Sequence, residues 1–325
     1  MRLNRRQLIS IGAAPLVAGG LGLAYAQTYP TKAVRMVVPY PPGGATDVIA
    51  RMVSEKLATH WAQPVVVENR AGAGATVGAE VVAKSAPDGY TLFETTSAHT
   101  ISASLYRKLP YNPIKDFSAI TLIATVPLVL VTAPTVPAKT LPDLIAFAKS
   151  KPQGVSVAST GNGTAQHLTA ELFKGRTGIQ TVHVPYKGDA PMITDLLGGQ
   201  VEMAFATLSA VLPHIKSGKL NAIALAHGKR MTALADVPTF AEAGMANFEA
   251  ATWFGIFAPA GLPAELRDRI YKDISLIVST PAMTQKLVEM GGEVNNYSPA
   301  QFDSFIQKET ARWAEAVRIS GARVD

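Results

Sequence analysis

The chain has 325 residues, more than one hydrophobic core usually serves, so we expect two domains. Its formal net charge is +6, which falls to +3 without Arg2, Arg5 and Arg6, and no later run of Lys or Arg suggests nucleic-acid binding. The absence of cysteine from the sequence excludes disulfides, thiolate metal sites, a cysteine nucleophile and a lipoprotein anchor.

Residues 1–26 have the pattern of a secretory signal peptide. A basic start precedes an apolar stretch at 8–23, and Ala24-Tyr25-Ala26 forms an A-x-A cleavage site. The pair Arg5-Arg6 resembles a twin-arginine signal, although paired arginines also occur in general secretory signals. We favour cleavage over a retained anchor, because the apolar stretch is short, rich in Gly and Ala, and interrupted by Pro15. A soluble periplasmic protein is therefore expected.

Strand-like and helical segments alternate along the mature chain. This pattern predicts an α/β fold in which helices cover a mainly parallel sheet. Strands are expected at 34–38, 64–67, 90–93, 118–124, 128–132, 155–159, 182–185, 202–206, 221–225 and 252–257. Between 118 and 132, Pro127 separates two apolar runs, so we expect one strand that leaves the first domain and another that enters the second. Two helices are expected to close the chain, at 263–278 and after Ser298.

The segment 34–51 combines a buried strand, a bare glycine turn and a helix start. Gly43-Gly44 leaves peptide N–H groups uncovered, and Thr46 or Asp47 can cap the helix that follows. Free N–H donors and the positive end of a helix dipole favour an anion at such a turn. The alternative is that glycine is present only because the turn is tight.

Three further loops follow predicted strands and carry small polar residues. The loop at 160–164 repeats the glycine turn before a helix, the loop at 95–100 includes Thr96 and Ser97, and the loop at 184–189 includes Tyr186 and Asp189. Ligands of open parallel sheets sit beyond the carboxyl ends of the strands. Four such loops together favour a cleft that binds a small molecule.

Other chemistries are weaker alternatives. The run Gly72-Ala73-Gly74-Ala75-Thr76-Val77-Gly78 follows a strand, with Glu94 at the end of the next strand, as in a dinucleotide site, but its glycine spacing is wrong, and close loop packing also explains it. The sequence lacks a nucleotide P-loop, a G-x-S-x-G nucleophile elbow and a histidine spacing typical of metal sites. His167 can reach a ligand anion, although packing or capping is the more common role.

Several motifs along the mature chain resemble the Bug family, the extracytoplasmic solute-binding proteins of tripartite tricarboxylate transporters. They include YPTKAVRMVVPYPPGGATDVIAR at 29–51, AGAGATVGAE at 71–80, APDGYTL at 86–92, STGNGT at 159–164, HVPYKG at 183–188, DVPT at 236–239 and APAG at 258–261. Because these motifs are collinear, together they are more specific than any one of them.

The resemblance implies a type II-like periplasmic binding protein, with two α/β lobes around a central cleft and hinge crossover strands. The lobes would be 27–125 with 250–325, and 126–249. Family members grip a ligand carboxylate with main-chain amides and ordered waters from two facing glycine turns. Carried over, this implies a site of Gly43, Gly44, Ala45, Thr46, Asp47, Thr160, Gly161, Asn162, Gly163 and Thr164, with Thr96, Ser97, Tyr186 and Asp189 toward the distal end. Tyr40 begins Tyr40-Pro41-Pro42, which replaces a smaller loop and changes the shape of the cleft.

The sequence thus predicts a monomeric, non-enzymatic periplasmic protein that captures a small organic anion, most simply a carboxylate, without a cofactor, and delivers it to membrane transporter subunits. An exported dinucleotide-dependent oxidoreductase and a ligand-sensing module for a membrane receptor, such as a sensor kinase, remain alternatives. Replacing Gly44 or Gly163 with valine is expected to abolish ligand binding and to leave the thermal transition largely intact.

Overall fold

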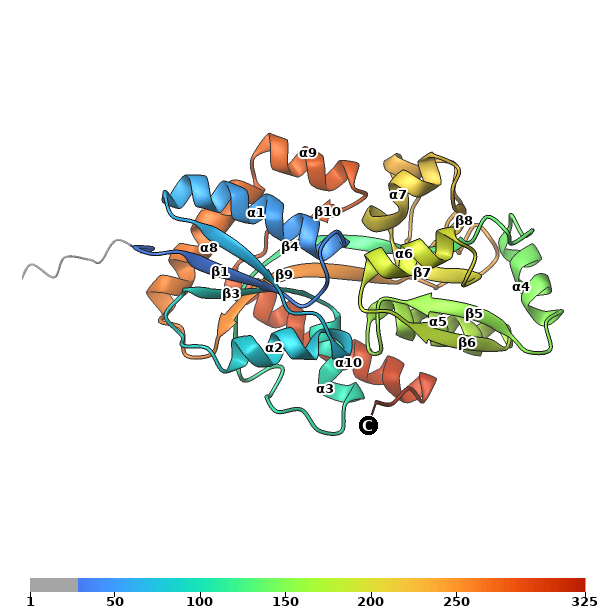
Figure 1. The fold of residues 1–325 in the computed structure, drawn as a ribbon, viewed down its shortest axis with the longest axis horizontal. Helices are drawn as coiled ribbons and strands as arrows, with labels where there is room; N and C mark the ends of the chain where they lie inside the picture. The colour runs from blue at the N-terminus through green and yellow to red at the C-terminus, as the bar shows by residue number, and fades with distance from the viewer. Residues whose placement is uncertain (1–28, 325) are drawn as a thin grey trace, which may run out of the picture.

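The structure is a computed structural model that describes residues 29–324, so the predicted signal peptide lies outside the described residues. Two α/β lobes share one continuous sheet with the strand order β2-β1-β3-β9-β4-β7-β5-β6, and β8 and β10 also pair with β4 (Figure 1). The elements in chain order are β1 (Val34–Val38), α1 (Ala45–Trp61), β2 (Val65–Asn69), η1 (Ala73–Ala75), α2 (Thr76–Ala83), β3 (Thr91–Thr96), α3 (Ala98–Leu105), β4 (Phe117–Thr132), α4 (Leu141–Lys149), β5 (Val155–Ser159), α5 (Ala165–Thr177), β6 (Thr181–Pro185), α6 (Asp189–Leu197), β7 (Met203–Thr207), α7 (Leu208–Lys216), β8 (Asn221–Leu225), η2 (Thr232–Leu234), β9 (Ala251–Pro259), α8 (Ala264–Val278), α9 (Pro281–Glu289), β10 (Glu293–Val294) and α10 (Pro299–Ser320).

Helices cover both faces of the sheet in each lobe. In the first lobe α1 and α8 lie on one face and α2 on the other, while in the second lobe α6 and α7 lie opposite α5 (Figure 1). The long helix α10 contacts both α3 and α5, so it reaches beneath both lobes. Its start has a capping box between Ser298 and Gln301, with Pro299 at the first helical position, as expected from the sequence.

The strand β4 passes from one lobe to the other without interruption, which corrects the prediction of two strands separated by Pro127. Pro127 pairs with Ala251 of β9, and the next residue, Leu128, pairs with Thr207 of β7. The proline has no N–H to donate, and the ladder resumes at once, because the Leu128 N–H donates to the Ala250 carbonyl at 2.9 Å. Proline is tolerated here because β4 changes partner at this point.

The sheet is mixed, whereas the sequence predicted a mainly parallel one. The pairs β1–β2, β1–β3, β5–β6 and β5–β7 are parallel, as expected for strands joined by helices. The strands β4 and β9 run antiparallel to their neighbours. Chain direction in these two crossover strands is set by the path between the lobes, which local patterns do not encode. A further helix, α9, also lies between the two that were expected to close the chain.

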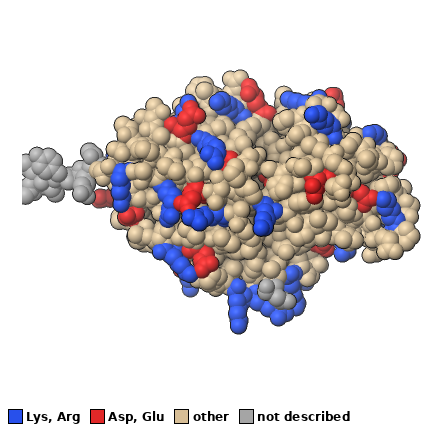
Figure 2. Space-filling view, in the orientation of Figure 1, with Lys and Arg blue, Asp and Glu red and all other residues tan. Residues whose placement is uncertain are grey.

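Aromatic side chains fill the core of each lobe. In the first, Trp253 and Phe257 of β9 pack on Phe302 of α10 with ring centroids 5.8 and 4.9 Å apart. In the second, Phe205 of β7 stacks on Phe240 at 5.9 Å. No helix among residues 29–324 is long and apolar enough to span a membrane. On the face drawn in Figure 2, basic and acidic side chains are interspersed over both lobes.

Glu94 of β3 is a buried carboxyl group without a hydrogen-bond partner. Its side chain has no exposed surface, and neither carboxyl oxygen has a partner. Burial, and secondarily the charge of Asp47, raises the pKa of Glu94 well above its ordinary value of 4.5. This position is incompatible with an exposed carboxylate that binds a nucleotide ribose.

We expect Glu94→Gln to remove a pH-dependent loss of stability. The pKa of Glu94 is raised in the folded state. Its contribution to the free energy of unfolding is therefore fully present below pH 4.5, and it is lost as the pH rises through the pKa of the folded state. At pH 7 the Gln variant should be more stable by roughly 1–3 kcal/mol, because a neutral Gln is buried without the proton uptake that Glu94 requires on folding. Urea unfolding between pH 4 and 8 measures this difference. Glu265→Gln, at an exposed position of α8, is the control, and equal slopes for all three proteins would contradict the prediction.

Candidate functional site

A small cavity lies where the two lobes meet, and we call it the inter-lobe cavity. Its volume is about 10 Å³, which is room for one water molecule. Its lining residues are Tyr40, Ala45, Thr46, Thr96, Thr160, Gln166, Asp189, Thr207, Thr252 and Phe254. Both lobes and the crossover strand β9 contribute to this wall, so the cavity can accept a larger molecule only if the lobes move apart.

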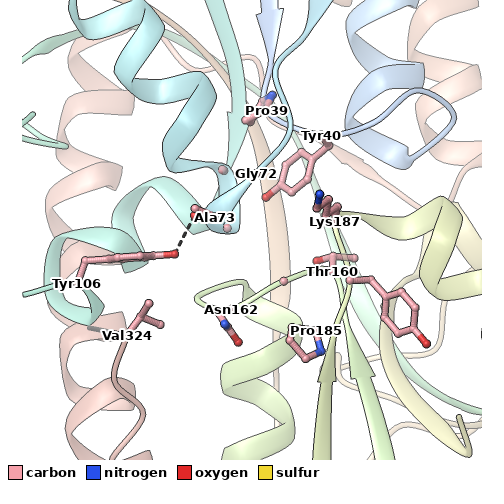
Figure 3. A pocket seen from close by; sticks show the side chains of 14 residues that line it. Pro39, Tyr40, Gly72, Ala73, Tyr106, Thr160, Asn162, Pro185, Lys187 and Val324 are labelled. Carbon is pink, nitrogen blue, oxygen red and sulfur yellow. Dashed lines mark hydrogen bonds between the residues drawn. The ribbon is translucent and has the colours of Figure 1, made fainter. Parts of the chain in front are cut away.

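A second cavity of about 350 Å³ adjoins the first, and Tyr40 and Thr160 line both. We call it the mouth cavity. Figure 3 shows the turn around Ala73 on one side and Asn162 with Lys187 on the other. The remaining lining residues are Pro39, Gly72, Gly74, Ala75, Tyr106, Gly161, Pro185, Tyr186 and Val324. The Tyr106 hydroxyl donates to the Ala73 carbonyl at 2.7 Å and so braces this turn.

Glycines allow the lobes to approach closely around these cavities. A Cβ atom on Gly74 would lie 2.0 Å from the carbonyl oxygen of Asn162. A Cβ on Gly163 would lie 2.5 Å from Leu105 Cδ2, and one on Gly44 would lie 3.1 Å from Asp189 Oδ2. The two glycine turns predicted from the sequence therefore each face the opposite lobe, although they meet different partners there.

The N-terminus of α1 presents its first peptide N–H groups to the inter-lobe cavity. Gly44 is extended, with φ −81° and ψ 170°, and its carbonyl accepts the first intrahelical bond from the Val48 N–H. The Ala45 N–H, which has no acceptor within the helix, donates to Asp189 Oδ2 at 3.1 Å across the lobe boundary. A carboxylate oxygen of the protein itself therefore lies at the positive end of α1, where the sequence predicted a ligand anion.

The carboxylate of Asp47 faces away from that position. It accepts the Gly43 N–H at 3.0 Å and both Nε and Nη2 of Arg51 at 2.9 Å, and it also bonds to Asn69. Burial alone would raise the pKa of Asp47, but the Arg51, Gly43 and Asn69 hydrogen bonds lower it. Asp47 thus stays charged and holds the glycine turn in shape.

The second glycine turn uses most of its polar groups internally. The Gly161 N–H donates to Ser159 Oγ at 3.2 Å, and the Gly163 N–H donates to His167 Nδ1 at 3.3 Å. Thr164 caps α5, and its hydroxyl donates to the Gly161 carbonyl at 2.8 Å. This turn therefore contributes shape and the Thr160 side chain to the cavity, while its N–H groups stabilise the loop.

His167 has a local structural role. Its ring stacks on that of His183 with centroids 4.1 Å apart and planes 14° from parallel. Burial lowers the pKa of both rings to about 4, so both are neutral near pH 7. The Gly163 N–H donates to His167 Nδ1, so this ring nitrogen must be an unprotonated acceptor. The contact agrees with the packing or capping role that the sequence also allowed for His167.

Side-chain hydroxyl and amide groups form pairs around the inter-lobe cavity. The Tyr40 and Thr96 hydroxyls lie 2.9 Å apart, and those of Ser97 and Thr252 lie 3.2 Å apart. Gln166 Nε2 donates to the Thr207 hydroxyl at 2.9 Å. These groups are uncharged donors and acceptors, and a polar guest can exchange hydrogen bonds with them.

The structure brings together only part of the predicted site. The residues that line a cavity are Tyr40, Ala45, Thr46, Thr96, Thr160, Gly161, Asn162, Tyr186 and Asp189. The residues that line neither are Gly43, Gly44, Asp47, Ser97, Gly163 and Thr164. Tyr186 lines the mouth cavity, and its hydroxyl donates to Asp195 Oδ2 at 2.7 Å.

Four residues of the inter-lobe cavity were missed in the sequence: Gln166, Thr207, Thr252 and Phe254. Two of them could have been identified by their position in the sequence. Gln166 lies in the first turn of the helix after the second glycine turn, and Thr207 is the last residue of a strand. Thr252 and Phe254 lie on β9, and nothing local shows that β9 passes the cavity. No cluster of three or more His, Cys, Asp or Glu side chains suited to a metal ion occurs in residues 29–324.

The chain is similar to proteins of one family over most of its length. The profile described as "Tripartite tricarboxylate transporter family receptor" matches residues 49–321. The protein BugT of Bordetella pertussis is 39% identical over 321 residues, which cover 98% of each chain.

Solved structures share the same architecture. The periplasmic binding protein BugD is 32% identical, with a TM-score of 0.87 over 91% of this chain and 99% of that chain. An R. palustris protein solved with adipate is 35% identical, with a TM-score of 0.88 over 91% of this chain and 100% of that chain. These structures have the two-lobed periplasmic binding fold described above.

Proposed function

The chain belongs to the tripartite tricarboxylate transporter receptor family, which includes the Bug proteins, and from this premise we propose that it is a periplasmic solute-binding protein. It captures a small organic acid between its lobes and delivers it to membrane transporter subunits. The observation that carries the proposal is the inter-lobe cavity, whose wall combines the N-terminus of α1 from one lobe with Asp189 and Thr160 from the other.

The guest is an organic acid held through a carboxylate. The N-terminus of α1 lines the inter-lobe cavity at Ala45 and Thr46, and hydroxyls from both lobes surround its positive end. The related R. palustris protein was solved with adipate, a dicarboxylate. The hydroxyls of Tyr40, Thr96, Thr207 and Thr252 pair with another hydroxyl or an amide and not with a base that would activate them, which favours reversible binding without covalent chemistry.

The lobes are residues 27–125 with 250–325, and residues 126–249. The partner change of β4 at Leu128 and the start of β9 at Ala251 support this division. Leu128, Ala226 and Ala250 are linked by three backbone hydrogen bonds of 2.9 Å, so both crossovers lie side by side. Opening of the cleft is a hinge motion about this point.

Export through a cleaved N-terminal signal places the protein in the periplasm. The basic start, apolar stretch and A-x-A site at residues 1–26 support this part of the proposal, as does the similarity to the periplasmic protein BugD.

A thermal-shift assay with six acids tests the function. We define an acid panel of succinate, glutarate, adipate, aspartate, glutamate and 2-aminoadipate. At a free concentration of about 100 times its Kd, a true ligand adds about 2.7 kcal/mol to the free energy of unfolding, which should raise the Tm of a chain of this length by about 4 °C. NMR should recover the ligand unchanged. Turnover of a panel acid, or the absence of any shift, would contradict the proposed function.

A further inference from the structure

Asp189 is a buried carboxylate with one oxygen left unpaired at the ligand cavity. It is the first residue of α6 and is 8% exposed. Oδ2 accepts the Ala45 N–H at 3.1 Å, whereas Oδ1 has no hydrogen-bond partner. Since Asp189 lines the inter-lobe cavity, this oxygen is available to a guest in the cavity.

The charge of Asp189 is not balanced by its surroundings. Among the described residues that line the inter-lobe cavity, none is Lys, Arg or His, and Asp189 is the one carboxylate. Asp47, the nearest carboxylate on α1, is neutralised by Arg51. Burial raises the pKa of Asp189 to about 6, and the Ala45 N–H lowers it only in part. Near pH 7 the closed cleft therefore holds a negative charge that no cationic side chain of the cavity wall balances.

This charge discriminates between classes of organic acid. A plain dicarboxylate would bring further negative charge beside Asp189 in a space that water has largely left, and that repulsion is strong when the local dielectric is low. An ammonium group on the guest would instead give Oδ1 a charge-assisted hydrogen bond and balance the buried charge. A metal cation is a poorer fit, because it needs several carboxylate or carbonyl ligands and the cavity wall supplies one carboxylate.

We propose that Asp189 makes the cleft selective for an organic acid that also carries an ammonium group, so that the guest is a zwitterion and not a simple dicarboxylate. The inference rests on the proposed function, and it adds the chemical class of the guest. In this arrangement the guest's carboxylate lies toward the hydroxyls and the N-terminus of α1, and its ammonium group bonds to Asp189 Oδ1.

The acid panel contains three matched pairs that test the proposal: succinate with aspartate, glutarate with glutamate, and adipate with 2-aminoadipate. The members of each pair differ by the ammonium group. Calorimetry at pH 7.5 should show that the wild-type protein binds the amino member of its best pair about 10- to 100-fold more tightly, as expected for one hydrogen bond to a buried charge.

Asp189→Asn removes the charge and keeps the shape. We expect the preference within the best pair to fall to about threefold or less, mainly through weaker binding of the amino acid. Asp268→Asn, at an exposed position of α8, changes the net charge equally and should keep the wild-type preference. The melting temperature of each variant without ligand serves as the check on folding.

The pH dependence of binding gives a second readout. The titratable or charged groups around Asp189 are Tyr40, whose pKa burial raises, Asp47 with its partner Arg51, and Lys187 two residues earlier. A dicarboxylate should require protonated Asp189, so its affinity should fall about tenfold per pH unit above pH 6. The amino acid should show no such slope, and Asp189→Asn should abolish the slope for the dicarboxylate.

The two proposals fail in different ways. If dicarboxylates bind the wild-type protein as tightly as their amino partners, or if Asp189→Asn leaves the preference unchanged, the inference about Asp189 is wrong while the solute-binding function stands. If no panel acid binds either protein, the proposed function is contradicted as well.

Discussion

Gly74→Ala is expected to weaken binding of the best panel acid by more than about 100-fold, because it prevents the lobes from closing. The new Cβ atom would lie 2.0 Å from the Asn162 carbonyl oxygen in the other lobe, and backbone atoms on both sides cannot yield as a side chain can. A separation of the lobes here also separates the N-terminus of α1 from Asp189. Calorimetry measures the affinity, and small-angle scattering measures whether ligand still compacts the protein.

The matched control for Gly74→Ala is Gly178→Ala. Both glycines have left-handed backbone, with φ of +59° and +69°, so alanine costs each about 1–2 kcal/mol of local strain. Gly178 ends α5, and a Cβ there would meet no atom within 4 Å. The control should therefore bind as the wild-type protein does. Affinity within about threefold of wild type for Gly74→Ala would show that this contact does not limit closure.

Gly44→Val is expected to weaken binding by about 10- to 100-fold by covering the first N–H groups of α1. A Cβ at this position would lie 3.1 Å from Asp189 Oδ2, and the two methyl groups would occupy space that the guest needs. Because Gly44 has φ −81°, valine can adopt this backbone, and the change in Tm should stay below about 4 °C. Titration calorimetry and a thermal melt measure the two effects.

Gly175→Val in α5 is the control for Gly44→Val, since a Cβ there also meets no atom within 4 Å. It should retain full affinity. If Gly44→Val binds equally well, the N-terminus of α1 is not part of the site.

The structure changes the expectation for Gly163→Val. From the sequence, this variant and Gly44→Val were expected to act alike, each with an intact thermal transition. Gly163 instead has φ +76°, and its Cβ would lie 2.5 Å from Leu105 Cδ2. Valine there would strain the turn even in the open state, so we now expect a lower Tm together with weaker binding.

Local patterns predicted the parts of the fold that are built from neighbouring residues. The strand, glycine turn and helix at 34–51 and at 155–173 form as expected, because proline, glycine and apolar spacing act within a few residues. The path of β4 through Pro127 could not be predicted in this way, since it depends on which strand lies beside it. The helix α3 after Ser97 was missed for a similar reason: its first turn includes the polar residues His99 and Thr100, and packing against α10 stabilises it.

The residues of the candidate site were likewise predictable only where neighbouring residues in the sequence define their position. Tyr40, Thr46 and Thr160 follow predicted strands; the rule that ligands bind at strand ends located their loops, and the family resemblance implied the residues. Asp47 could not be distinguished from a ligand contact, because its bond to Arg51 becomes visible only once the helix is built. The position of Asp189 opposite Ala45 depends on how two lobes meet, because the partners are 144 positions apart in the sequence. No local pattern encodes such a contact.

The most direct test of the account is solution scattering of the wild-type protein with and without the panel acid that binds most tightly. The inter-lobe cavity of about 10 Å³ is too small to admit an organic acid while the lobes are together, so the proposed function requires an open form in solution. We predict that saturation with the acid reduces the radius of gyration and that the acid is recovered chemically unchanged. Tight binding at a constant radius would contradict closure of two lobes on a guest.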